Sequence, residues 1–191
     1  MRGVAVQLGL RFCDTTKDRS YKQETGGLPD HLPLFASADF DTTVSDLSYG
    51  TFAGYPVQVF SYDAVVYRDE PEKTNRTCVL FKVPAVFPAL TIAPHSRLSM
   101  ASRRTSQVNP FTLRFQTIGR DTEFQEALLD DNMQKWLAGL PDGMRIEINR
   151  DAVLAHVGLT DPEEVPGMVT TLFTFMLQIP ELVMSRWGTG H

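Results

Sequence analysis

The stretch from Leu47 to Ala93 constrains the fold most strongly. Valine, phenylalanine, tyrosine, isoleucine and threonine dominate it, and turn-forming residues interrupt it at short intervals. Residues of these types favour extended backbone, and such spacing is typical of strands joined by short turns. We therefore expect an antiparallel β-meander with these strands: Leu47–Phe52, Tyr55–Tyr67, Thr77–Pro84 and Ala89–Ala93.

The first turn of this meander carries two glycines four residues apart, Gly50 and Gly54. A phosphate-binding loop would lead from its last glycine into the N-terminus of a helix. Here Pro56 and a β-branched, aromatic run follow at once, so the chain continues as a strand. The sequence predicts that Ala53-Gly54 is the tip of a tight hairpin in which Gly54 has a positive φ.

Helices and strands are both expected outside the meander. Before the meander we expect a helix at Val4–Gly9 and a strand at Leu10–Cys13. After it we expect an alternating strand at Phe111–Thr117, then a helix that is capped by Asp121 and stopped by Gly139 and Pro141. A hairpin of Met144–Asn149 and Ala152–Val157 follows, and a capping box at Thr160–Glu163 opens a last helix that is kinked or ends at Pro180.

This order of elements, a β-meander followed by β-α-β-β-α, lacks the regular alternation of a doubly wound sheet. The predicted fold class is therefore α+β, with the C-terminal helix packed on the sheet. Its apolar stripe consists of Val165, Met168, Leu172, Met176, Ile179 and Val183.

The length of 191 residues is typical of one domain, and we expect a single domain over 1–191. Glycine and proline at Gly26, Gly27, Pro29 and Pro33 predict an irregular polar connection at about 14–44.

The charge excludes a general nucleic-acid binder, because 18 basic and 23 acidic residues give a formal charge of -5. Arg97, Arg103 and Arg104 are too few for a basic interaction segment and predict a solvated loop. The most apolar C-terminal stretch, Val165–Met184, is interrupted by threonines, Gln178 and Glu181. We therefore expect a soluble chain in which this stretch does not span a membrane.

Metal and cofactor sites are not expected. The two cysteines, Cys13 and Cys78, form no paired motif, and Cys78 lies in an apolar run where a free thiol behaves as a small buried hydrophobe. His31, His95, His156 and His191 stand in no zinc-binding spacing. We expect His156 to be a solvent-facing or hydrogen-bonded residue of a strand.

One short motif suggests catalysis. Asp39 to Thr43 fits DxDxT, the loop with which haloacid-dehalogenase-type phosphohydrolases attack phosphorus beside magnesium. That loop follows a buried parallel strand, which Pro33, Ser37 and Ala38 disfavour here. A magnesium-dependent phosphohydrolase using Asp39 and Asp41 is therefore the weakest of three functional hypotheses.

Two clusters near the C-terminus have simple structural interpretations. Asp161, Glu163 and Glu164 are expected in the first helical turn, where carboxylates complement the helix dipole. The methionines and phenylalanines of the last helix indicate core more strongly than a pocket. A lipid or other apolar ligand between the sheet and this helix is nevertheless the second hypothesis.

The chain resembles an actinobacterial protein family over about Leu8 to Pro180. The matching segments are 50–57 (GTFAGYPV), 60–62 (FSY), 80–90 (LFKVPAVFPAL), 111–115 (FTLRF) and 121–124 (DTEF), with Leu128, Leu129, Met133, Trp136 and Leu137 behind them. More distantly, the order of elements is similar to the cytoplasmic domain of the mycobacterial trehalose monomycolate transport factor, a partner of a lipid exporter.

The resemblance implies a role without catalysis. Family members commonly begin with a transmembrane helix ahead of the segment that matches Val4–Phe12, and this sequence shows none there. The first hypothesis is therefore a non-enzymatic cytosolic interaction module at or near the inner membrane, in cell-envelope assembly or lipid transport. Its expected partner is a protein, which the resemblance places in the membrane. No cofactor and no catalytic residues are implied.

Overall fold

The protein is described here by a computed structural model that covers residues 1–15, 27–36, 40–67, 71–95 and 109–188. Its helices and strands are α1 (Arg2–Leu8), β1 (Arg11–Cys13), β2 (Phe40–Phe52), β3 (Tyr55–Tyr67), β4 (Pro71–Pro94), α4 (Pro110–Arg114), β5 (Phe115–Gly119), α5 (Thr122–Leu128), α6 (Asp131–Leu137), β6 (Arg145–Gly158), α7 (Val165–Leu177) and α8 (Glu181–Trp187).

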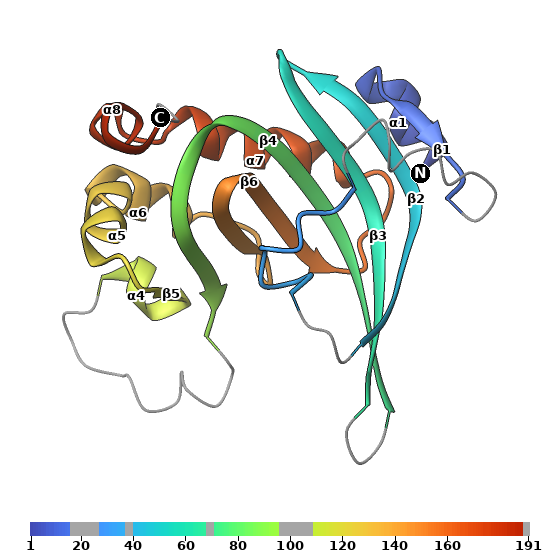
Figure 1. The fold of residues 1–191 in the computed structure, drawn as a ribbon, viewed down its shortest axis with the longest axis horizontal. Helices are drawn as coiled ribbons and strands as arrows, with labels where there is room; N and C mark the ends of the chain where they lie inside the picture. The colour runs from blue at the N-terminus through green and yellow to red at the C-terminus, as the bar shows by residue number, and fades with distance from the viewer. Residues whose placement is uncertain (16–26, 37–39, 68–70, 96–108, 189–191) are drawn as a thin grey trace.

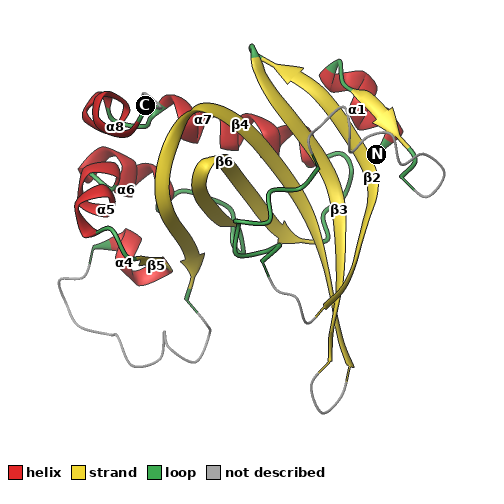
Figure 2. Cartoon of the chain, viewed as in Figure 1, coloured by secondary structure: helices red, strands yellow, loops and turns green. Residues whose placement is uncertain are grey.

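The predicted α+β class is confirmed. The six strands form one antiparallel sheet in the order β1-β2-β3-β4-β5, and β6 also pairs with β4. Figure 1 shows β4 as an arch across the molecule, with α4, α5 and α6 beside its C-terminal half and α1 at the opposite end, next to β2. Figure 2 shows the helices α7 and α8 along the arch. The prediction of one domain over 1–191 stays a prediction.

The hairpin at Ala53-Gly54 is confirmed. Phe52 pairs with Tyr55, and both turn residues have positive φ, 50° at Ala53 and 88° at Gly54. A two-residue turn of this kind matches the twist of the strands it joins. β2 begins earlier than predicted, within the expected connection at 14–44, and Asp46 (φ 54°) marks a bulge near its middle.

β4 corrects the prediction of two separate strands at Thr77–Pro84 and Ala89–Ala93. It is one strand of 24 residues, and Pro84 and Pro88 lie inside it where its pairing with β6 is irregular. Proline lacks the N–H that a regular ladder needs, so it is tolerated in a strand at such irregular positions.

β6 corrects the hairpin predicted at Met144–Asn149 and Ala152–Val157. The chain does not turn back at 149–151. Instead Arg150 takes a positive φ of 51° opposite Phe87, and both halves of β6 pair with β4. The extra residue is a bulge, which bends a strand without ending it.

The irregularities of β4 and β6 shift the two strands together. In β4 the buried residues on the face that the helices cover change from odd numbers (Phe87) to even numbers (Leu90). In β6 they change from even numbers (Ile148) to odd numbers (Val153). Strict alternation would turn half of each strand to the wrong face. Because the shifts lie at the same level, all four side chains remain on the face that the helices cover.

The strand predicted at Phe111–Thr117 is wrong in its first half. Asn109 caps a short helix by accepting the N–H of Phe111 at 2.9 Å, and Pro110 occupies its first turn. Phe111 and Phe115 then stack at 5.8 Å. A spacing of four residues fits one helix face as well as one strand face, so the alternation was ambiguous.

The helix predicted after Asp121 is divided into α5 and α6. Asp121 caps the first through the N–H of Phe124, as predicted, and Asp130 caps the second through the N–H of Met133 at 2.8 Å. Asp130 therefore begins a helix instead of lying inside one.

The capping box predicted at Thr160–Glu163 does not form. Residues 162–164 form a turn, and α7 begins at Val165 without a side-chain cap. Asp161, Glu163 and Glu164 thus precede the helix and do not lie in its first turn. The predicted end at Pro180 is confirmed, because α8 starts after it.

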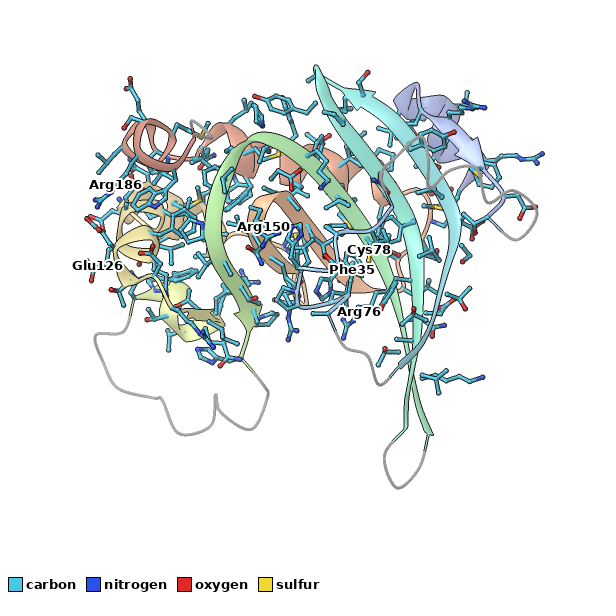
Figure 3. All side chains as sticks on the ribbon, viewed as in Figure 1. Phe35, Arg76, Cys78, Glu126, Arg150 and Arg186 are labelled. Atoms are coloured by element: carbon cyan, nitrogen blue, oxygen red, sulfur yellow. The ribbon has the colours of Figure 1, made fainter. Side chains whose placement is uncertain are left out.

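Two hydrophobic cores lie on opposite faces of the sheet. The larger is between the sheet and the helices, and it includes most of the predicted stripe of α7. The smaller lies between the sheet and residues 27–36, which we call the cover segment. Leu32, Phe60, Cys78 and Leu154 are fully buried there. Figure 3 shows Phe35 and Cys78 in this smaller core.

Replacing Ala53 with glycine should stabilise the protein. A side chain at positive φ is strained, and glycine removes that strain, so we expect Ala53→Gly to raise the free energy of unfolding by about 0.5–1 kcal/mol in urea titrations. Ala127→Gly in α5 is the matched control and should lower it by about 1 kcal/mol. A loss of stability in Ala53→Gly would contradict the turn geometry.

Candidate functional site

A buried acid–base pair lies beneath the cover segment. Glu147 and His156 are nine residues apart on β6, and the bulge at Arg150 places both on the face away from the helices. Glu147 Oε1 is 3.2 Å from His156 Nε2, and the two side chains are 1% and 0% exposed. Such a pair has the chemistry of a catalytic dyad, but both side chains are buried and thus shielded from a substrate in solvent.

The pair ties the cover segment to the sheet. Leu34 donates its N–H to Glu147 Oε2 at 3.0 Å, and Tyr62 donates its hydroxyl to Leu34 O at 3.3 Å. Asn149 Nδ2 donates to His31 O at 2.7 Å, and His31 Nε2 is 3.1 Å from Asn149 O. A buried carboxylate is tolerated when its oxygens accept such bonds. These hydrogen bonds therefore hold the cover segment on the sheet and stabilise the fold.

Burial keeps His156 neutral. Removal from water lowers its pKa, and this effect outweighs the nearby Glu147, which acts in the opposite direction. A neutral ring donates Nε2–H to Glu147, which leaves Nδ1 as an acceptor without a partner among the described atoms. The prediction of a hydrogen-bonded strand histidine is confirmed, and a solvent-facing one is excluded.

The DxDxT segment has a different setting from a phosphohydrolase loop. Asp39 lies outside the described residues. Asp41 belongs to β2 and pairs with Val65 of an antiparallel neighbour, and every pairing in the described sheet is antiparallel. The parallel strand that positions such a nucleophile is thus not part of this sheet.

The two thiols are buried in the smaller core and are not joined to each other. Burial raises the pKa of Cys78, so its thiol stays protonated and is a poor nucleophile. His95 Nε2 is 3.0 Å from Thr112 O. Within the described ranges, no three His, Cys, Asp or Glu side chains are grouped so that they hold a metal ion. Arg97, Arg103, Arg104 and His191 lie outside those ranges.

A pocket lies between β6 and α7, where the second hypothesis places an apolar ligand. It has a volume of about 350 Å³, and we call it the α7 pocket. Its lining comes from the loop before β6, from β6, from the turn before α7 and from α7 itself: Pro141, Asp142, Met144, Val157, Thr160, Glu164, Gly167, Met168 and Thr171.

The α7 pocket is apolar at its base and acidic at its mouth. Met144 and Met168 are buried and Val157 is half-buried, so they form the floor. Asp142 and Glu164 are exposed and form the rim. Met168 therefore belongs both to the core, as predicted, and to the pocket floor.

Two sets of hydrogen bonds hold the segments that border the mouth of the pocket. Arg114 donates to Leu140 O and to Asp142 Oδ1, both at 2.7 Å, and also to Ala138 O. On the other side, Thr160 donates its N–H to Thr77 Oγ1 at 3.1 Å. The planar guanidinium fixes several acceptors at once, so the loop at 138–142 is held in one position.

Gly167 opens the wall of the pocket on the α7 side. A Cβ at this position would meet no atom within 4 Å. Its backbone is helical, so other residues fit there without strain. The second hypothesis locates a ligand beside this helix, but it does not identify the lining residues from β6 and from the loop before it, which only the packing of α7 on β6 brings together.

The described helices differ from a membrane span in length or composition. No single helix is long and apolar enough to cross a bilayer. Only α7 and α8 taken together reach that length and composition, and they are bent by 78° relative to each other.

Comparison of the sequence with protein-family models and with curated proteins finds no match. Comparison with solved structures finds a likeness to the crystal structure of the mycobacterial trehalose monomycolate transport factor A, TtfA. The TM-score is 0.62 at 10% sequence identity, and the match covers 94% of this chain and 93% of that one. At this identity the likeness shows a shared fold.

The buried His156 should make stability depend on pH. Its pKa is lower when folded than when unfolded, so the unfolded chain binds more protons below about pH 6.5 and acid favours unfolding. We expect the urea concentration at the midpoint of unfolding to fall when the pH is lowered from about 7.5 to about 5.5. His156→Gln should reduce this dependence of the midpoint on pH. His95→Gln is the control and should keep it. An unchanged slope in His156→Gln would refute this assignment.

Proposed function

We propose that this protein is a non-enzymatic interaction module that works at the cytosolic face of the inner membrane, in cell-envelope assembly or lipid transport. The observation that carries the proposal is the likeness to the trehalose monomycolate transport factor over nearly the whole of both chains. Because the likeness covers 94% of one chain and 93% of the other, it extends over the whole arrangement of sheet and helices.

The chemistry of the described residues supports a role in binding. Glu147 and His156 are engaged with each other, Glu147 also bonds to the cover segment, and Cys78 is buried. The hydrogen bonds of this pair stabilise the fold. The α7 pocket is open to a partner, and a pocket of this kind suits recognition.

The family resemblance supports the location. Members of that actinobacterial family commonly carry a transmembrane helix ahead of the segment that matches Val4–Phe12. In this chain α1 overlaps the start of that segment and contacts α7 and β2. We therefore infer that the protein is cytoplasmic and acts beside the membrane through a membrane-embedded partner.

Capture from native membranes tests the proposal. The tagged full chain, crosslinked before detergent extraction, should recover one defined membrane protein well above the level obtained with the untagged chain. The expected partner is an envelope-assembly or lipid-export component. Recovery of no membrane protein above that level would count against an inner-membrane role.

The α7 pocket favours a second candidate, the binding of an apolar small molecule between the sheet and α7. Its floor of Met144, Val157 and Met168 supplies apolar contact, and its volume of about 350 Å³ is within the range of ligand pockets.

Native mass spectrometry tests this second candidate. Protein purified from its native cells should carry a bound mass, and Gly167→Trp should lose that mass because the indole fills the pocket. Thr170→Trp, at an exposed position of the same helix, should retain it. An identical bound mass in both variants would place the ligand elsewhere.

A further inference from the structure

We propose that the α7 pocket binds a short basic segment of a protein partner, in which one large apolar side chain is flanked by lysine or arginine. This inference rests on the proposed function, because it names the chemistry of the partner. It is carried by the combination of an apolar floor with an acidic rim.

The floor requires an apolar anchor. Met144 and Met168 are buried and flexible, and methionine surfaces adapt to side chains of different shape. The open wall at Gly167 leaves space for a bulky group beside them. A large apolar side chain in a desolvated pocket is the usual centre of a binding interface.

The rim requires positive charge next to that anchor. Asp142 is paired with Arg114, but Glu164 and its neighbours Asp161 and Glu163 have no cation within ion-pair distance among the described residues. All three carboxylates are exposed, and Glu164 lines the pocket. They attract lysine and arginine and repel anionic lipid headgroups and fatty-acid carboxylates.

The position of the carboxylates at the mouth of the pocket favours an apolar side chain with basic neighbours over a single inserted lysine. A lone lysine side chain would place its ammonium group at the methionine floor and its aliphatic stem at the carboxylate rim. An apolar side chain with basic neighbours reverses that order and matches both regions. Cytosolic loops of membrane proteins carry an excess of lysine and arginine close to apolar segments, so a membrane-embedded partner offers this pattern.

Selection from a phage-displayed library of random peptides against the full chain provides the test. We expect enriched peptides to share an aromatic or aliphatic residue flanked by lysine or arginine. A synthetic peptide with phenylalanine between two lysine pairs should bind, and its affinity should fall as salt is added. Enrichment of acidic peptides, or no enrichment, would overturn the proposal.

Two pairs of variants locate the binding. Gly167→Trp fills the pocket and should weaken binding at least about tenfold, whereas Thr170→Trp should not change it. Glu164→Lys should weaken binding by about fivefold and reduce the salt dependence, and Glu181→Lys on α8 should not. Unchanged circular dichroism shows that each variant is folded. Equal binding by Gly167→Trp and the parent chain would exclude the pocket.

The two proposals fail separately. Peptide binding that needs Gly167 and Glu164, without capture of a membrane protein, leaves the pocket assigned and removes the inner-membrane role. Capture of the same membrane protein by Gly167→Trp leaves that role intact and assigns the contact to another surface. An apolar small molecule that the selected peptides do not displace would also overturn the peptide assignment.

Discussion

The hydrogen-bonded pairing of β4 with β6 continues past the irregularities at Phe87 and Arg150, and the two cores depend on it. β4 also pairs with β3 and β5, so a shift of one residue in this strand would move three neighbours. Because both strands change phase at the same level, the helices meet an unbroken apolar face. The opposite face gains the polar residues Glu147 and His156, and the cover segment bonds to Glu147.

The sequence predicted the fold class, the hairpin at Ala53-Gly54, the cap at Asp121 and the end of α7, because each depends on nearby residues. The strand boundaries were harder. Prolines in β4 and the polar residues at 149–151 suggest turns when considered locally, whereas the structure uses them as bulges. A bulge is stabilised by a partner strand that is distant in sequence, so local composition cannot distinguish it from a turn.

The candidate site was less predictable than the fold. Alternation in the strand placed Glu147 opposite the apolar residues, but nothing in the polar segment before Phe35 indicated that it would cover that face. The floor of the α7 pocket joins Met144, Val157 and Met168, which are brought together only by the packing of α7 on β6. Of the two acidic residues of its rim, only Glu164 belongs to the acidic cluster that is predicted from the sequence to lie in a first helical turn, whereas in the structure it precedes α7 and lines the pocket.

The anchoring of the cover segment has a consequence for folding kinetics. Leu34 contacts Glu147 across 113 residues of sequence, and His31 contacts Asn149 across 118. Contacts of such high sequence separation close large loops, and they form after the local hairpin and helices. We therefore expect the smaller core to assemble late, once β6 is in place. Because long-range bonds hold the cover segment to the sheet, we expect the amide of Leu34 to exchange faster in the native state than the amides of the helix-covered core.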